Sequence, residues 1–108
     1  PKLVFTAAGL AINKCLKVTS LKKSKVDLFE VNEAFAVQAL LTARTVGIDP
    51  QALNVLGGTL ALGHPLGASG ARGLVTLISA LKAKNEKIGL TSVCLGGGGA
   101  LAMALEMV

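Results

Sequence analysis

Apolar residues recur at helical spacing in the first part of the chain. Ala8, Ala11, Ile12, Cys15 and Leu16 fall on one face of a helix, and polar side chains occupy the opposite face. This pattern predicts an amphipathic helix with one buried side. Cys15 belongs to that side, so we interpret it as a core residue.

Two apolar segments follow a polar, lysine-rich connection at residues 19–25. Residues 26–31 are rich in β-favouring side chains and predict a short strand. Residues 33–46 are apolar on nearly all sides, with only a thin polar stripe, and predict a helix that is buried on most faces. Gly47 and Pro50 end this segment, because glycine and proline are typical of helix C-termini.

The second half of the chain alternates helix and strand signals. The helical pattern of residues 69–84 is followed by an apolar strand at 88–95, a glycine turn at 96–99 and a second strand at 100–108. A strand, a glycine turn and a strand in succession predict a closing antiparallel hairpin. At the other end of the chain, the apolar residues 3–6 predict the end of a strand or a crossing segment. This alternation predicts an α/β fold.

Composition is consistent with one domain of 108 residues built around one core. Apolar residues make up 52% of the chain, and the mean hydropathy is +0.65. No uninterrupted apolar run approaches the length of a membrane span. The apolar excess therefore indicates either a domain that packs against another one or a very well-filled small core.

The charge balance favours a solvated surface over a nucleic-acid interface. Eleven Lys and Arg residues against six Asp and Glu give a formal charge of +5. Aromatic residues are only 3%, with no Trp or Tyr, so stacking platforms for single strands are nearly absent. We interpret the lysines as helix rims, with attraction of an anionic small molecule as the next alternative and nucleic acid as the weakest.

The two cysteines, Cys15 and Cys94, form neither a metal-binding spacing nor a disulfide framework. This usage predicts a reducing intracellular compartment, cytoplasmic by default, and leaves mitochondrion and peroxisome open. The N-terminus carries no signal or transit pattern and starts without Met, so a fragment or a processed piece is expected.

The segment from Gly63 to Gly70 holds the only histidine of the sequence, His64, followed by Pro65 and enclosed by glycines. Proline locks its own φ, and glycine allows close backbone approach, so the segment predicts a stiff, open turn. The turn would present the imidazole at a helix N-terminus, where anions are favoured. The alternative is a histidine that merely satisfies the turn.

Two other motifs lie where strands end. Asn32 precedes Glu33 between a strand and a helix, so it is either an N-cap or an amide that orients a water or substrate oxygen beyond the strand. Glu33 in the first helical turn predicts a capping or hydrogen-bonding role. Cys94 precedes the glycines 96–99, which indicates either a buried inert thiol or a thiol beside exposed backbone N–H groups. Neither a P-loop nor a dinucleotide fingerprint occurs.

Taken together and in this order, NEAF from Asn32, GHPLGASGAR from Gly63 and CLGGG from Cys94 resemble the C-terminal domain of thiolases. The resemblance implies that residues 1–108 form one thiolase-like half, a mixed sheet covered by helices, and that this half is incomplete at its N-terminal edge. It also implies a separate N-terminal half that carries the nucleophilic cysteine, which neither Cys15 nor Cys94 matches.

The resemblance implies a role for each motif. His64 would accept the proton of that nucleophilic cysteine and donate to the thioester oxygen of the second substrate. Asn32 would complete this oxyanion hole by holding a water molecule. Cys94 would abstract the α-proton of the attacking acyl-CoA, and the N–H of Gly96 would help form a second oxyanion hole.

The implied activity is acyl transfer between coenzyme A thioesters, by Claisen condensation or by thiolytic cleavage of 3-ketoacyl-CoA. Coenzyme A thioesters would be substrates, with no covalently bound cofactor and no metal, and a homo-oligomer is expected because dimers and tetramers are usual in the family. One alternative is a non-catalytic thiolase half that acts in dimerisation or partner binding. Another is a condensing enzyme that uses carrier-protein substrates.

Overall fold

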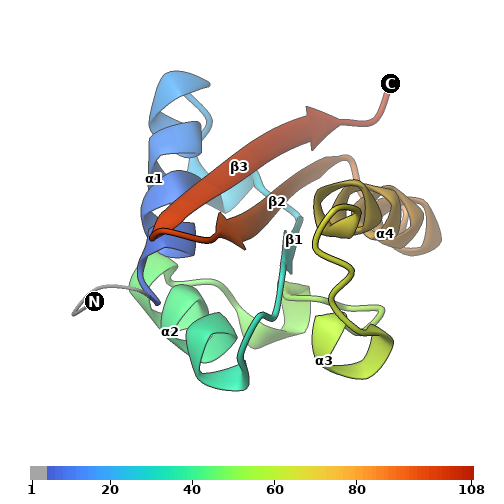
Figure 1. Ribbon diagram of the computed structural model, residues 1–108. Helices are drawn as coiled ribbons and strands as arrows, with labels where there is room; N and C mark the ends of the chain where they lie inside the picture. The colour runs from blue at the N-terminus through green and yellow to red at the C-terminus, as the bar shows by residue number, and fades with distance from the viewer. Residues whose placement is uncertain (1–4) are drawn as a thin grey trace.

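The computed structural model describes residues 5–108, which form a mixed three-stranded sheet with helices on both faces (Figure 1). The strands are β1 (Leu28–Val31), β2 (Ile88–Leu95) and β3 (Gly99–Glu106), in the order β1-β2-β3. β1 pairs with β2 in parallel, and β2 pairs with β3 as an antiparallel hairpin. The predicted α/β class and the closing hairpin are therefore confirmed.

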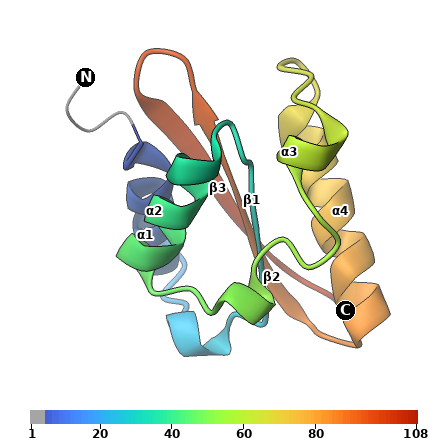
Figure 2. The same ribbon diagram turned by 90° about the horizontal axis from the view of Figure 1, so that it is seen from below.

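Helices α1 (Ala7–Val18) and α2 (Ala36–Val46) lie on one side of the sheet (Figure 2). The short helix α3 (Thr59–Leu62) and the long helix α4 (Ser69–Lys84) lie on the other side. Two 3-10 turns, Lys23–Lys25 and Pro50–Ala52, connect these elements. Among the described residues, none of the helices is long and apolar enough to cross a membrane.

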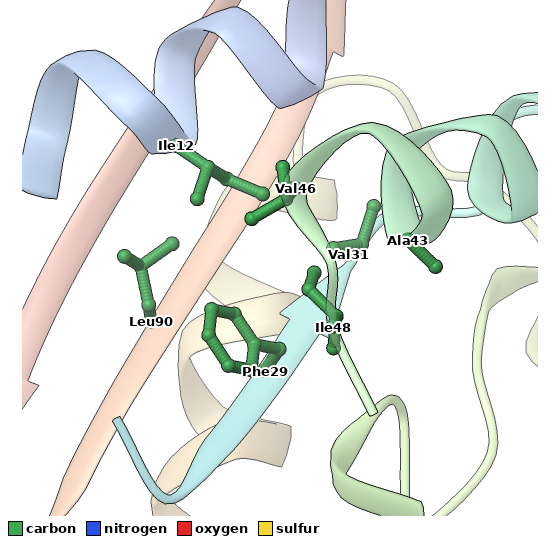
Figure 3. Packing of buried hydrophobic residues seen from close by; sticks show 7 residues of the cluster. All are labelled: Ile12, Phe29, Val31, Ala43, Val46, Ile48 and Leu90. Atoms are coloured by element: carbon green, nitrogen blue, oxygen red, sulfur yellow. The ribbon is translucent and has the colours of Figure 1, made fainter. Parts of the chain in front are cut away.

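The two faces of the sheet carry two separate clusters of buried side chains. Alternate residues of a strand point to opposite faces, so Phe29 and Val31 join one cluster while Leu28 joins the other. Figure 3 shows the larger cluster, where Phe29, Val31 and Leu90 from the sheet meet Ile12 from α1 and Val46 from α2. Both faces are covered, as in other α/β folds.

The predicted helix at residues 33–46 is wrong in its start and in its burial. The helix begins at Ala36, because Phe35 is still extended with φ −146° and ψ 145°. Its apolar side chains Val37 and Leu40 are 56% and 60% exposed, whereas the polar Gln38 is buried. Gln38 Nε2 donates to the Thr42 hydroxyl at 3.3 Å, which lets the polar stripe face inward.

Other predicted boundaries hold more closely. The helix at 69–84 and the strand at 88–95 are confirmed as α4 and β2, and α1 buries Ala8 and Ile12 as predicted. Cys15 is half-buried against the core cluster. Within the predicted segment 3–6, residues 3 and 4 lie outside the described residues, and Phe5 and Thr6 form a turn.

Candidate catalytic site

The site begins at the edge of the sheet where β1 and β2 both end. Val31 is paired with Ser92, and the Asn32 N–H donates to the Ser92 carbonyl at 2.8 Å. Because the two strands are parallel, residues just after Val31 and Ser92 lie at one edge of the sheet, so Asn32 and Cys94 share it. The hairpin turn and the loop between α3 and α4 reach the same end of the molecule (Figure 2).

Asn32 is 2% exposed, and its side chain is held on both sides. Its Oδ1 accepts a hydrogen bond from the Thr59 hydroxyl at 2.7 Å, and its Nδ2 lies 3.3 Å from His64 Nε2. The structure therefore brings Asn32 and His64 into contact although 31 residues separate them in the chain. The N-cap interpretation of Asn32 is wrong, because the N-cap of α2 is Phe35.

His64 lies in the loop that joins α3 to α4. The preceding Gly63 has φ +89°, a left-handed conformation that favours glycine. On the far side of the ring, Nδ1 lies 2.6 Å from the Ser69 hydroxyl at the start of α4, and that hydroxyl donates to the Pro65 carbonyl at 3.0 Å. The predicted turn before the helix N-terminus thus holds the imidazole from both ring nitrogens.

Cys94 lies one residue before the end of β2, opposite Ala100 of β3, and is a half-buried free thiol. The turn that follows has Gly97 and Gly98 at φ +83° and +85°, a left-handed conformation that favours glycine. Gly96 is exposed, and a Cβ added there would meet no atom within 4 Å. No hydrogen bond among the described residues joins Cys94 to His64 or Asn32, so the structure places Cys94 and Gly96 at the same end without bringing them into contact with the pair.

Glu33 does make the predicted type of hydrogen bond, but it serves another helix. Its carboxylate accepts from the Leu60 backbone N–H in the first turn of α3 at 3.0 Å and from Asn54 Nδ2 at 3.0 Å. A Cβ at Gly58 would overlap this carboxylate, so the missing side chain lets Glu33 reach the helix. Glu33 thereby ties the segment after β1 to the segment that precedes His64.

A buried ion pair behind the site was not singled out from the sequence. Glu30 is 2% exposed and accepts a hydrogen bond from Arg72 Nη1 at 3.0 Å. Burial raises the pKa of Glu30 above its ordinary value of 4.5, although the hydrogen bond and charge of Arg72 act in the opposite direction. Arg72 Nη2 lies 3.4 Å from the hydroxyl of Thr59, so the pair is connected to the site.

A signal for these residues does exist in the sequence. Glu30 interrupts an apolar strand, and an acidic residue on a strand with both faces covered needs a partner. Thr59 has no such signal, because it lies in a four-residue helix with no periodic pattern. Within residues 5–108, no group of three or more His, Cys, Asp or Glu side chains could hold a metal ion.

The chemistry available here is that of proton transfer beside hydrogen-bond donors. An imidazole in contact with a buried amide can exchange a proton and can direct N–H groups at one oxygen atom. A thiol at a neighbouring strand end, followed by an open glycine turn, adds a second ionisable group.

Comparisons with known proteins match this geometry to one family. Residues 1–107 match the model described as "Thiolase, C-terminal domain". Acetyl-CoA acetyltransferase 1 of Arabidopsis thaliana is 52% identical over 108 residues, which are 100% of this chain and 26% of that protein. Acetyl-CoA acetyltransferase of Escherichia coli is 48% identical over 106 residues, 98% of this chain and 27% of that protein.

The fold agrees with these sequence matches. The crystal structure of the Bacillus anthracis acetyl-CoA acetyltransferase superposes with a TM-score of 0.95 and 38% identity, covering 100% of this chain and 27% of that one. The chain thus spans about a quarter of the length of these relatives. Sequence, fold and the order of the three motifs all agree, and the chain belongs to the thiolase family, in which it corresponds to the C-terminal domain.

Proposed function

We propose that this chain supplies the C-terminal part of the active site of an acyl-CoA thiolase. The reaction is acyl transfer between coenzyme A thioesters, by Claisen condensation or by thiolytic cleavage of 3-ketoacyl-CoA. The observation that carries the proposal is the contact between Asn32 Nδ2 and His64 Nε2 at the end of β1. It is supported by relatives named acetyl-CoA acetyltransferase.

The first half of the reaction needs a nucleophile that this chain does not supply. A cysteine thiol of an N-terminal half transfers its proton to His64, and the thiolate attacks the acyl carbonyl of the first thioester. The coenzyme A thiolate leaves with the proton of the Cys94 thiol, so an acyl-cysteine, a Cys94 thiolate and a protonated His64 remain. The N–H of Gly96 stabilises the oxyanion of this step.

The second half is a carbon–carbon bond formation. The Cys94 thiolate removes an α-proton from the second acyl-CoA, and the enolate oxygen accepts hydrogen bonds from protonated His64 and from a water held by Asn32. The enolate carbon then attacks the carbonyl carbon of the acyl-cysteine. The bond between that carbon and the cysteine sulfur breaks, which restores the thiolate of the nucleophilic cysteine and gives 3-ketoacyl-CoA as the product. Thiolysis runs through the same steps in reverse.

The partners follow from the same proposal. An N-terminal half must cover the site, and its docking would bury apolar side chains that are exposed here, such as Phe35, Val37 and Leu40. The same exposed face favours a second candidate, a non-catalytic thiolase half that acts in dimerisation or partner binding. A homo-oligomer and a reducing compartment, with lipid or fatty acid metabolism as its setting, complete the proposal.

The test compares thiolysis of acetoacetyl-CoA by this chain alone and by this chain together with a thiolase N-terminal half. We expect no turnover by the chain alone, because the nucleophile is missing, and turnover by the combination. In the active combination, His64→Ala and Cys94→Ala should each lower kcat by about 100- to 1000-fold, the typical loss when such a group is removed.

Cys15→Ala is the matched control, since Cys15 is the other free thiol and packs against the core on α1. We expect its kcat to stay within about twofold of wild type, in line with a side chain outside the site. Turnover by the chain alone, or full activity of His64→Ala, would contradict the catalytic proposal. A well-folded complex without turnover would favour the non-catalytic candidate.

A further inference from the structure

We propose that Thr59 is a positioning residue: it orients the Asn32 amide and thereby keeps His64 Nε2 as the unprotonated nitrogen of the neutral imidazole. The inference rests on the proposed function, in which His64 accepts a proton from a cysteine. It assigns a role to a residue outside the three motifs.

Thr59 is well placed to act on both residues. It is the first residue of α3 and is 4% exposed. Its hydroxyl contacts Asn32, and its backbone carbonyl accepts from the Gly63 N–H at 2.8 Å, immediately before His64. One short helix therefore sets the position of the amide and of the loop that carries the imidazole.

The direction of the hydrogen bond between Thr59 and Asn32 follows from the neighbours of Thr59. Arg72 can only donate, so its contact at 3.4 Å uses a lone pair of the Thr59 hydroxyl and leaves the hydroxyl proton free. No other side-chain or backbone group among residues 5–108 accepts that proton. The separation of 2.7 Å from Asn32 Oδ1 is typical of an O–H donor, whereas amide donors lie farther away.

The orientation of the amide decides the tautomer of the imidazole. With Oδ1 facing Thr59, the Asn32 group that faces His64 Nε2 at 3.3 Å is an NH2 group, which has no acceptor. Nε2 must then accept, so in the neutral ring the proton is on Nδ1. A flipped amide would present Oδ1 to the ring and favour a proton on Nε2.

The other side of the ring leads to the same assignment. The Ser69 hydroxyl has one proton, and it is donated to the Pro65 carbonyl at 3.0 Å. At 2.6 Å from His64 Nδ1, the Ser69 oxygen must therefore accept, and Nδ1 must carry the proton. Thr59 and Ser69 thus act on opposite ring nitrogens with one result.

This tautomer is the one that proton acceptance requires. The hydrogen bond that Asn32 Nδ2 donates to His64 Nε2 is long at 3.3 Å and therefore weak. The Nε2 lone pair can give up this hydrogen bond and accept the proton of a thiol. Once Nε2 is protonated, it no longer accepts from Asn32, and both nitrogens are hydrogen-bond donors. Two neighbouring donors suit a developing oxyanion or the water that contacts it.

The buried ion pair keeps Thr59 in this role. Glu30 holds Arg72 Nη1 at 3.0 Å, and Nη2 of the same guanidinium reaches Thr59. A planar guanidinium held at one nitrogen directs the others, so the hydroxyl is unable to turn its proton toward Arg72. The ion pair therefore acts on the site through Thr59.

The experiment compares Thr59→Val with Thr59→Ser in the active combination of this chain and a thiolase N-terminal half. Valine keeps the shape of threonine and removes the hydroxyl, whereas serine restores it. We expect Thr59→Val to lower kcat by about 100-fold, the typical cost of a misplaced group, with KM within about threefold. Thr59→Ser should recover most of the lost kcat.

The tautomer itself is the readout that a merely structural role would not move. With 15N-labelled histidine, and the His64 signals assigned by their loss in His64→Asn, the wild type should show an unprotonated Nε2 and a protonated Nδ1. Thr59→Val should shift His64 toward a mixture of both tautomers, and Thr59→Ser should return it to the wild-type form.

Protonated Nε2 in the wild-type neutral ring, or wild-type tautomer and kcat in Thr59→Val, would overturn the proposal. If Thr59→Val does not fold, Thr59→Ala takes its place, because it also removes the hydroxyl that orients the Asn32 amide and should also produce a tautomer mixture. Failure of the proposed function looks different: the combination would show no turnover, or His64→Ala would keep full activity, while the tautomer measurement would still decide the role of Thr59.

Discussion

At the scale of single residues, the buried carboxylate of Glu30 links stability to the site. Its ion pair with Arg72 lies inside the sheet–helix interface, and Arg72 reaches on to Thr59. Removing one partner of such a pair leaves the other charge buried and unpaired, which typically costs about 3–5 kcal/mol. Retaining the pair therefore matters for folding as well as for the orientation of Asn32.

The raised pKa of Glu30 makes a pH-dependent contribution to stability. Burial raises the pKa above 4.5, so the folded protein binds this proton more tightly than the unfolded chain. The free energy of unfolding should consequently decrease as pH rises from about 4.5 through the folded pKa. Denaturant titrations at several pH values, compared with Glu30→Gln, measure this contribution.

The informative quantity is the unfolding free energy of wild type minus that of Glu30→Gln. We expect this difference to fall across that pH window and to be level on either side of it, because only the wild type titrates at position 30. A difference that grows as pH rises would show that the folded state lowers the pKa of Glu30 instead.

Several features at this scale were readable in the sequence. The motif around His64 and the one at Asn32 each predict a site residue, and the two side chains lie in contact at 3.3 Å. Thr59 was not predicted, because the partners that give its hydroxyl a direction lie 27 residues before it and 13 residues after it. Hydrogen-bond direction across such separations has no local sequence signal.

At the scale of elements, the fit of α4 against the sheet depends on a missing side chain. Gly89 of β2 faces Leu77 of α4, and a Cβ at this glycine would lie 2.9 Å from three carbon atoms of that leucine. Leu77 is 1% exposed and belongs to the smaller core cluster, so it has little room to move. The separation between helix and sheet is therefore set at this contact.

We predict that Gly89→Ala destabilises the protein by about 1–3 kcal/mol, the usual cost of overpacking a core. Gly70→Ala is the matched control, since Gly70 lies on α4 and a Cβ there meets nothing within 4 Å. Alanine is a better helix former than glycine by about 1 kcal/mol, so the control should be neutral or stabilising. Urea unfolding midpoints compare the two, and equal midpoints would contradict the predicted role of Gly89.

The boundaries of helices and strands are predicted well where the hydrophobic pattern continues over many residues. The sixteen residues of α4 show a sustained helical pattern, and the strand of β2 is bounded by a lysine and a glycine turn. The helix α2 was misjudged because its apolar residues are numerous on every side, so the pattern alone does not say which side faces the core. The buried side turned out to carry Gln38 and Thr42, whose hydrogen bond satisfies part of their polar groups.

At the scale of the whole molecule, the chain exposes more large apolar side chains than a closed surface would. They lie on several elements, and include Leu10, Phe35, Val37, Leu40, Leu60, Leu62, Leu66, Val75, Leu101 and Met103. Large exposed apolar areas are typical of interaction sites. Of the two sequence-based interpretations of the apolar excess, packing against another unit fits the structure better.

We predict that the 108-residue chain studied alone self-associates and binds an apolar dye, because these side chains find no cover within it. Leu40→Gln and Leu60→Gln, both about 60% exposed, should reduce dye binding and association while leaving the unfolding midpoint nearly unchanged. Sedimentation velocity and dye fluorescence measure both. Leu81→Ala, in the core, is the contrasting variant and should lower the midpoint instead.

A monodisperse monomer without dye fluorescence would contradict this prediction. It would mean that the exposed leucines are scattered singly over the surface, as in many soluble proteins. The apolar excess would then have to be explained by the two core clusters alone.

By itself, the sequence determined the class of the fold, the hairpin at the C-terminus, the long helix after His64 and the three motifs of the family. These features depend on local patterns, namely hydrophobic periodicity, glycine turns and short fixed spacings, which are present in the amino-acid sequence itself. Only the tertiary structure decided which side of α2 is buried, where the carboxylates of Glu30 and Glu33 bond, and how Thr59 orients the site. Those outcomes depend on contacts between distant segments, whose geometry exists only once the sheet and its two helical layers have formed.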